Sequence, residues 1–134
     1  MSLDALGLAL PLFVAVPLLA GGLLVIAGER PGLHRRVLLS LLGLSSLGGA
    51  GLILLTLDGT VVAGGVGGWP DGIAIAFAAD TFTSLMLTLT AGLSWVGALF
   101  AYGSRVTNSV YFAPLLLVLT AGVNGALLTA DLFN

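Results

Sequence analysis

Four long apolar stretches, each free of charged side chains near its middle, constrain this sequence more than any other feature. They run from about Leu3 to Ala27, Val37 to Leu57, Phe82 to Tyr102 and Val110 to Ala130. Each has about 20 residues or a little more, so as a helix it would span roughly 30 Å, the thickness of a bilayer's hydrocarbon core. We therefore expect an all-α integral membrane protein with about four transmembrane helices in a single membrane domain.

The composition supports this fold class. Of the 134 residues, 58% are hydrophobic and only 7% are charged, whereas about a quarter of the residues in soluble domains carry charge. A water-soluble domain of this size could not bury so much apolar surface. The chain has no cysteine, which excludes disulfides and thiolate metal sites, and no basic patch that would suit nucleic acid.

The arginines predict the orientation in the membrane. Arg30, Arg35 and Arg36 lie between the first two stretches, and Arg105 lies between the last two. No other connection contains Lys or Arg, so the arginine side should be cytoplasmic and both termini should face outward. His34 lies among these arginines, and we interpret it as a solvated loop residue rather than a pH sensor.

The connection between the second and third stretches predicts a short β-hairpin, at about residues 60–78 on the extracytoplasmic surface. Trp69-Pro70-Asp71-Gly72 is typical of a turn, and apolar residues alternate with alanine after it. Thr60 to Val62 could form the partner strand. The glycine-rich run Gly64 to Gly68 is interpreted as a turn, and Trp69 should sit at the headgroup level. Such a hairpin should pack on these helices or on a neighbouring subunit.

Side chains that could carry chemistry within the apolar stretches are few. No Asp, Glu, Lys or Arg lies near the middle of a stretch, and most of the hydroxyl groups should bond back to their own helix. Asn124 cannot satisfy its amide in that way. We expect it to hydrogen-bond to another helix, and the alternative is that it contacts a water-lined ion path.

Two acids lie at predicted helix ends. Asp80 precedes the third helix and should cap it, the alternative being a cation ligand near the membrane surface. Asp131, followed by Leu132-Phe133-Asn134, should cap a further helix, the alternative being an ion ligand at the outer mouth. Because a cap needs a helix to cap, we expect these 134 residues to be part of a longer protein.

An enzymatic function is not indicated. The sequence holds no nucleophile with a nearby base, no metal-binding cluster and no phosphate-binding loop before a soluble helix. We therefore expect no cofactor, no metal site and no catalytic residue.

Several segments carry a resemblance to a known family. They are Gly67-Gly68-Trp69-Pro70, Ala79-Asp80, and the run from Ala121 through Asn124 and Asp131 to Asn134. Together they resemble the N-terminal part of the D subunit of Mrp-type multisubunit Na⁺/H⁺ antiporters, which is related to the antiporter-like subunits of respiratory complex I. The resemblance covers essentially the whole chain but only about the first quarter of such a subunit.

The resemblance implies a subunit of an ion-transporting complex in the bacterial cytoplasmic membrane. In the family a hairpin follows the second helix, and the Asp-Leu-Phe-Asn run opens the fifth. The buried Glu and Lys on which proton movement depends follow later, and neither position exists in this sequence. Asn124 and Asp131 match positions near that fifth helix, so the resemblance implies them as candidates for an ion pathway. The other hypotheses are an antiporter-like subunit of an NADH–quinone oxidoreductase or related complex, and a four-helix membrane adaptor without a transport role.

Overall fold

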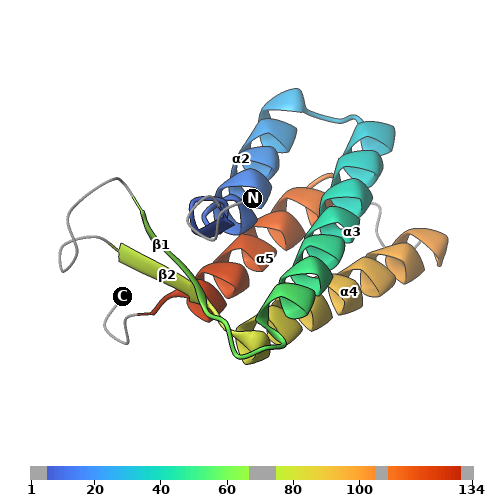
Figure 1. The fold of residues 1–134 in the computed structure, drawn as a ribbon. Coiled ribbons are helices and arrows are strands. Elements are labelled where there is room, and N and C mark those ends of the chain that lie inside the picture. Colours follow the sequence, from blue (N-terminus) through green and yellow to red (C-terminus); the bar gives the residue numbers. More distant parts are fainter. Residues whose placement is uncertain (1–5, 67–74, 105–108, 131–134) are drawn as a thin grey trace.

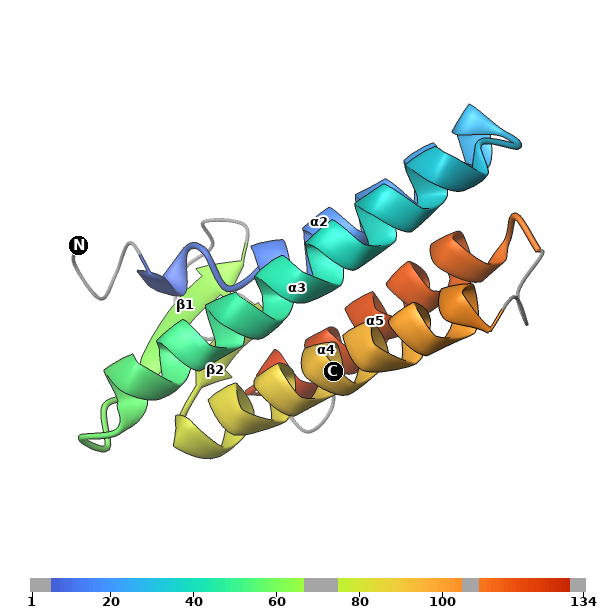
Figure 2. The ribbon, with the colours of Figure 1, turned by 90° about the vertical axis from the view of Figure 1, so that its right-hand side faces the viewer.

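The computed structural model describes residues 6–66, 75–104 and 109–130. Within them, two helices, two strands and two more helices follow one another along the chain. They are α2 (Leu12–Ala27), α3 (Pro31–Thr56), β1 (Val62–Val66), β2 (Ile75–Ala79), α4 (Thr81–Gly103) and α5 (Phe112–Leu128). The helices run side by side as a bundle, and the two strands lie across one end of it (Figures 1 and 2). The connection between α2 and α3 lies at the opposite end.

Two helix starts differ from the sequence expectation. The long helix begins at Leu12 rather than near Leu3, because Pro11 stands at the N-cap and residues 8–10 before it form turns. In contrast, α3 begins at Pro31 rather than Val37. Proline suits the first position of a helix, so the helix continues through polar residues that hydropathy alone assigns to a loop.

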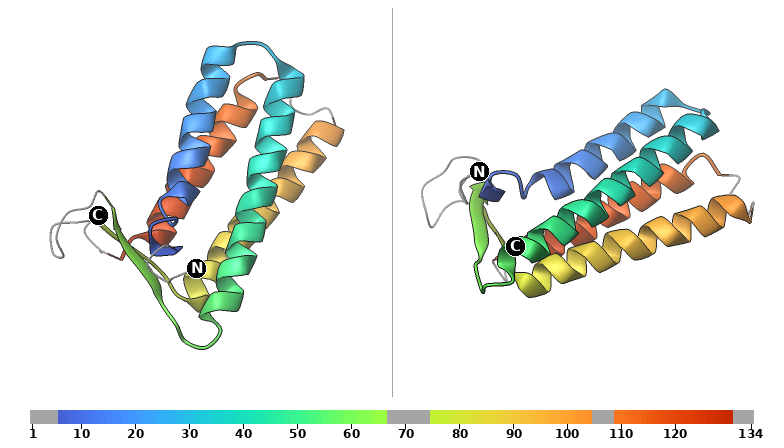
Figure 3. Two further views of the ribbon diagram at one scale, coloured as in Figure 1. Left: turned by 45° about the horizontal axis from the view of Figure 1, so that its top comes forward. Right: turned by 45° about the vertical axis from the view of Figure 1, so that its right-hand side comes forward.

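The helices pack mainly as two pairs, α3 against α4 and α2 against α5. Small residues let both pairs come close. A β-carbon added at Gly49 would lie only 2.9 Å from the Thr88 backbone nitrogen, and one at Gly21 would lie 3.1 Å from the Pro114 carbonyl oxygen. Figure 3 shows that α2 and α3 are joined at one end of the bundle, yet they contact each other little along their length.

The sheet is antiparallel, with Val62 opposite Ala79 and Gly64 opposite Phe77. Val62 and Ala79 are fully buried in a cluster with Leu10, Leu52, Leu87 and Leu128, so the sheet packs on the ends of these helices. The residues of the predicted turn, including Trp69, lie outside the described residues.

The interpretation of Gly64 and Gly65 as part of a turn was wrong, since both lie in β1, which starts at Val62 and not at Thr60. The physical reason is a close backbone approach. A β-carbon on Gly64 would meet the carbonyl group of Gly7 at 2.5 Å, so only glycine lets the N-terminal turn rest on this strand.

Large apolar side chains cover the outside of the bundle. Ile26 is 83% exposed and Leu54 is 73% exposed, with many leucines between these values and half exposure. Within the described residues, α3 and α4 are long and apolar enough to cross a membrane, and α2 and α5 are shorter apolar helices. Such a surface suits lipid or neighbouring protein rather than water.

Candidate functional site

Asn124 joins α5 to α2 through the backbone of α2. Its Nδ2 atom donates a hydrogen bond to the Phe13 carbonyl oxygen at 2.9 Å, and the side chain is 1% exposed. In an α-helix that oxygen would accept from the residue four positions later, which here is Pro17, a residue without an N–H. Asn124 therefore satisfies a carbonyl that the proline leaves free. The expected bond to another helix is present.

The other polar atom of Asn124 has no such partner. Its Oδ1 is buried and accepts no hydrogen bond within the described part of the chain. A buried amide oxygen without a donor costs free energy. This oxygen would therefore be stabilised by a hydrogen bond from a water molecule or from a donor group outside the described residues. An amide does not titrate near neutral pH, so Asn124 cannot itself carry a proton.

Asp131 lies outside the described residues, but the chain just before it is placed. After α5 ends, the backbone becomes extended at Thr129, which forms an antiparallel bridge with Phe77 of β2. The Ala130 N–H then donates to the Ala76 carbonyl oxygen at 3.0 Å. The segment leading to Asp131 thus runs along β2, at the sheet end of the bundle.

Asp80 caps α4 as predicted. Its carboxylate accepts a hydrogen bond from the Thr83 N–H at 2.7 Å, and this bond is the main reason why the pKa of Asp80 is lowered from its ordinary value of 3.8. Next to it, the Thr81 hydroxyl donates to the Thr56 carbonyl oxygen at 2.6 Å. Together the two bonds fix the start of α4 against the end of α3.

The hydroxyl groups within the helices behave largely as expected. Thr88 donates to the Ser84 carbonyl oxygen at 2.8 Å, and Thr120 donates to that of Leu116 at 2.8 Å, both within their own helix. Ser46 instead reaches across from α3 to the Thr88 carbonyl oxygen at 3.5 Å, a long contact. These groups are therefore already engaged and form no continuous polar path among the described residues.

His34 is not the solvated loop residue that the sequence suggested. It lies in the first turns of α3 and is only 4% exposed. Its Nδ1 pairs with the Val110 carbonyl oxygen at 2.9 Å, and because a carbonyl can only accept, Nδ1 carries the proton. The Nε2 atom is buried without a partner in the described residues. Pro31 at the first helical position was the sequence signal that could have placed His34 on the helix.

The groups around His34 close the end of the bundle opposite the sheet. The Arg35 guanidinium lies 5.8 Å from the centre of the Tyr102 ring, within cation–π range. Tyr102 in turn meets Phe112 edge to face at 5.6 Å. Together these contacts join the start of α3 to the end of α4 and the start of α5. Among the described residues, no three His, Asp or Glu side chains lie close enough together to hold a metal ion.

Comparison with known proteins identifies relatives of one kind. No protein-family model matches the sequence. The D subunit of the Na⁺/H⁺ antiporter of Alkalihalophilus pseudofirmus is 30% identical over 130 residues, which cover 90% of this chain and 25% of that protein. The D subunit of a probable K⁺/H⁺ antiporter of Rhizobium meliloti is 39% identical over 69 residues, 52% of this chain and 13% of that protein.

A solved structure agrees with these relatives. One chain in the structure of the Mrp complex from Dietzia sp. superposes with a TM-score of 0.89 at 43% identity, over 96% of this chain and 24% of that chain. The chain thus spans about a quarter or less of the length of the proteins it matches. The chain is thus similar in sequence to the D subunits of Na⁺/H⁺ antiporters and similar in sequence and fold to a chain of a Mrp complex, as the resemblance in the sequence predicted.

Proposed function

We propose that this chain forms the N-terminal part of the D subunit of a Mrp-type antiporter, within a membrane complex that exchanges a monovalent cation for protons. The observation that carries the proposal is the match of fold and sequence over 96% of the chain to a chain of a Mrp complex. The names of the relatives include both Na⁺ and K⁺, so the proposal names only the class of cation.

Within that complex, the role proposed for these residues is structural. The middles of α2, α3, α4 and α5 contain no Asp, Glu, Lys or Arg, and proton carriage inside a membrane depends on buried ionisable groups. The bundle instead has hydrogen bonds that hold its helices together and an apolar outer surface. It would brace the helices that carry the protonatable groups. Asn124 Oδ1 is its first candidate for contact with water in a neighbouring path, and Asp131 is the second.

The same proposal includes the topology. All four apolar helices would cross the bilayer, with the arginines on the cytoplasmic side and the hairpin and both ends of this chain outside. The arrangement supports it, since α3 begins, with Arg30 at its N-cap, at one end of the bundle, and the strands lie at the other end (Figure 1). The distribution of arginines follows the positive-inside rule in bacterial membranes.

Purification of the chain from its own membranes tests this assignment. An affinity tag on the native protein should bring down other antiporter subunits, and everted vesicles containing that complex should show proton movement on addition of Na⁺ or K⁺. Co-purification with flavin and iron–sulfur subunits would instead assign the chain to an oxidoreductase. A stable assembly with a partner unrelated to transport would support the adaptor hypothesis.

A further inference from the structure

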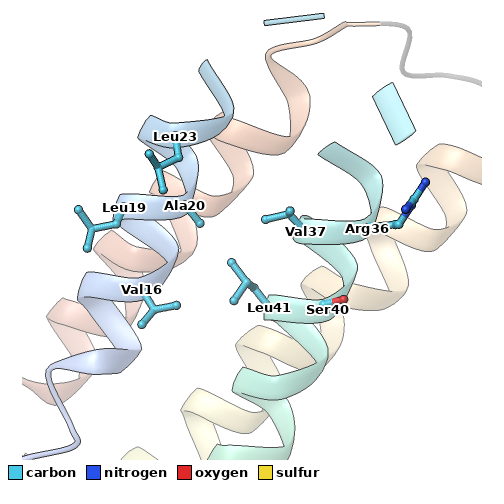
Figure 4. Close-up of a pocket in the computed structure, with 8 residues that line it drawn as sticks. All are labelled: Val16, Leu19, Ala20, Leu23, Arg36, Val37, Ser40 and Leu41. Carbon is cyan, nitrogen blue, oxygen red and sulfur yellow. The ribbon is translucent and has the colours of Figure 1, made fainter. Parts of the chain in front are cut away.

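The seam between α2 and α3 is hollow along its length. A first hollow of about 510 Å³ lies toward the end where the two helices connect, lined by Val16, Leu19, Ala20, Leu23, Arg36, Val37, Ser40 and Leu41. Figure 4 shows Val37 and Leu41 of α3 directed toward α2, and Val16 and Ala20 on the side of α2 that faces them. A second hollow of about 190 Å³ shares Val16 and Leu41 with the first. Because the two hollows share these residues, we treat them as one apolar groove.

The groove has the length of a lipid chain in one leaflet. Its α3 side runs from Arg36 to Ser45, about 13 Å at 1.5 Å per residue. One leaflet contributes half of the roughly 30 Å hydrocarbon core, or about 15 Å. A third hollow of about 400 Å³, which shares Phe13 with the second, continues toward the sheet.

The end of the groove carries positive charge. Arg36 lies at its rim, is exposed, and extends away from α2 toward the start of α3 (Figure 4), where its Nη2 lies near Gly32. No ion pair to Arg36 is formed within residues 6–66, 75–104 and 109–130. An unpaired guanidinium beside the mouth of an apolar groove suits an anionic phosphate, which Arg can hold with two parallel hydrogen bonds.

We propose that the groove between α2 and α3 binds an anionic phospholipid, with an acyl chain against Val16, Leu23 and Leu41 and the phosphate on Arg36. A basic residue between membrane helices on the cytoplasmic side is a recurrent site for anionic headgroups. Because α2 packs mainly on α5 and α3 packs mainly on α4, the seam between α2 and α3 stays open, and the lipid would fill it. The inference uses the membrane location and orientation of the proposed function but not antiport.

Photolabelling with a defined lipid tests the proposal. The purified complex is reconstituted with phosphatidylglycerol that carries a diazirine on one acyl chain, and the labelled residues are located by mass spectrometry. Labels should appear on the groove residues of α2 and α3, and unlabelled phosphatidylglycerol should compete better than phosphatidylcholine. The change Arg36→Gln should lower groove labelling about fivefold, which is the attraction of one basic residue to an anionic surface. Arg36→Lys keeps the charge but not the two parallel hydrogen bonds, so it should restore only part of the labelling.

Matched variants separate the groove from its surroundings. Arg30→Gln removes a nearby positive charge that does not line the groove, so it should leave the labelling unchanged. Ser40→Phe fills the groove from an exposed position and should abolish groove labelling, whereas Leu47→Phe, at a site 71% exposed and outside the groove, should not.

Three results would overturn the proposal. They are equal competition by phosphatidylcholine, an equal loss of labelling in Arg30→Gln and Arg36→Gln, and a photo-cross-linker at Leu23 that joins the chain to another polypeptide. None of these readouts measures ion exchange, so the lipid site can fail while the antiporter assignment stands, and the reverse also holds.

Discussion

Asn124 and Pro17 act as one unit, although they lie on different helices. Pro17 removes the N–H that would bond to the Phe13 carbonyl oxygen, and Asn124 supplies a replacement at 2.9 Å. In a bilayer, a backbone oxygen without a donor is expensive, so the proline in α2 requires a polar residue on the helix packed against it. This explains why an amide is buried in an otherwise apolar interface.

We predict that the two residues are energetically coupled. Asn124→Leu should destabilise the fold by about 1 kcal/mol, because it leaves the Phe13 carbonyl without a donor. In a Pro17→Ala background the new N–H can bond to that carbonyl, so the same Asn124→Leu change should cost clearly less. Unfolding in mixed micelles measures all four proteins, and equal costs in both backgrounds would show that the pairing is wrong.

Asp80 gives a prediction with a defined pH range. The Asp80→Ala change should destabilise the start of α4 by about 1 kcal/mol through loss of the cap. Because the folded pKa of Asp80 is lowered, the stabilisation by its charge is fully present above the ordinary value of 3.8 and is lost as pH falls through the lower folded pKa.

The control for this charge effect is Asp80→Asn, which keeps a capping oxygen but cannot titrate. The stability difference between wild type and Asp80→Asn should be constant from neutral pH down to about 4 and should shrink below it. Thermal unfolding across this range checks the prediction. A difference that changed between pH 5 and 7 would mean that another group is responsible.

At the residue scale, the sequence predicted the kind of bond at Asn124 but not its acceptor. Pro17 has no N–H to donate to the carbonyl oxygen of Phe13, four residues earlier, so that oxygen needs another donor. Nothing in a single sequence, however, indicates that α5 packs on α2 and supplies it. His34 was misplaced for a related reason. Hydropathy identifies the part of a helix that lipid can cover, whereas α3 extends beyond it to Pro31.

At the scale of elements, the pairing of α3 with α4 depends on Gly49. A β-carbon at this position would lie 2.6 Å from Thr88 Oγ1 and 2.9 Å from the Thr88 backbone nitrogen. Because one of these neighbours is backbone, a larger residue would force the two helices apart. The close approach follows from small residues on α3, as is common where membrane helices pack.

Gly49 and Gly51 form a matched pair on the same helix. Gly49→Ala should destabilise by about 1–3 kcal/mol through steric overlap. In contrast, Gly51→Ala meets open space and should stabilise slightly, by up to about 1 kcal/mol, because alanine favours helix. Unfolding of both variants in mixed micelles checks this. Equal effects of the two changes would contradict the close packing of α3 on α4.

The elements themselves were largely predictable, and their ends were not. Apolar length indicated the four helices, and the alternation that follows the predicted Gly/Pro turn indicated β2. The start of α2 at Leu12 follows from Pro11 at its N-cap, whereas the glycines within β1 depend on contact between Gly7 and Gly64, far apart in sequence. A tertiary contact of this kind leaves no periodic signal in the sequence.

At the scale of the whole molecule, the bundle is built as two helix pairs closed by a sheet at one end and by the His34–Val110 bond with the Arg35–Tyr102–Phe112 contacts at the other. Both closures tie together segments distant in sequence. Between them, the buried polar side chains of the helices in the described part of the chain other than His34 are hydroxyl groups that already form hydrogen bonds and the amide of Asn124. Such a body suits a scaffold beside a proton path, and this is the physical basis of the proposed role.

Reconstitution of these 134 residues alone in vesicles tests that role most directly. A pH-sensitive dye inside the vesicles reports proton movement when Na⁺ or K⁺ is added outside. Because the helices contain no ionisable group in their middles, we predict no cation-driven pH change with this chain, and a clear change with the complex that contains it. A cation-driven pH change by the chain alone would contradict the account.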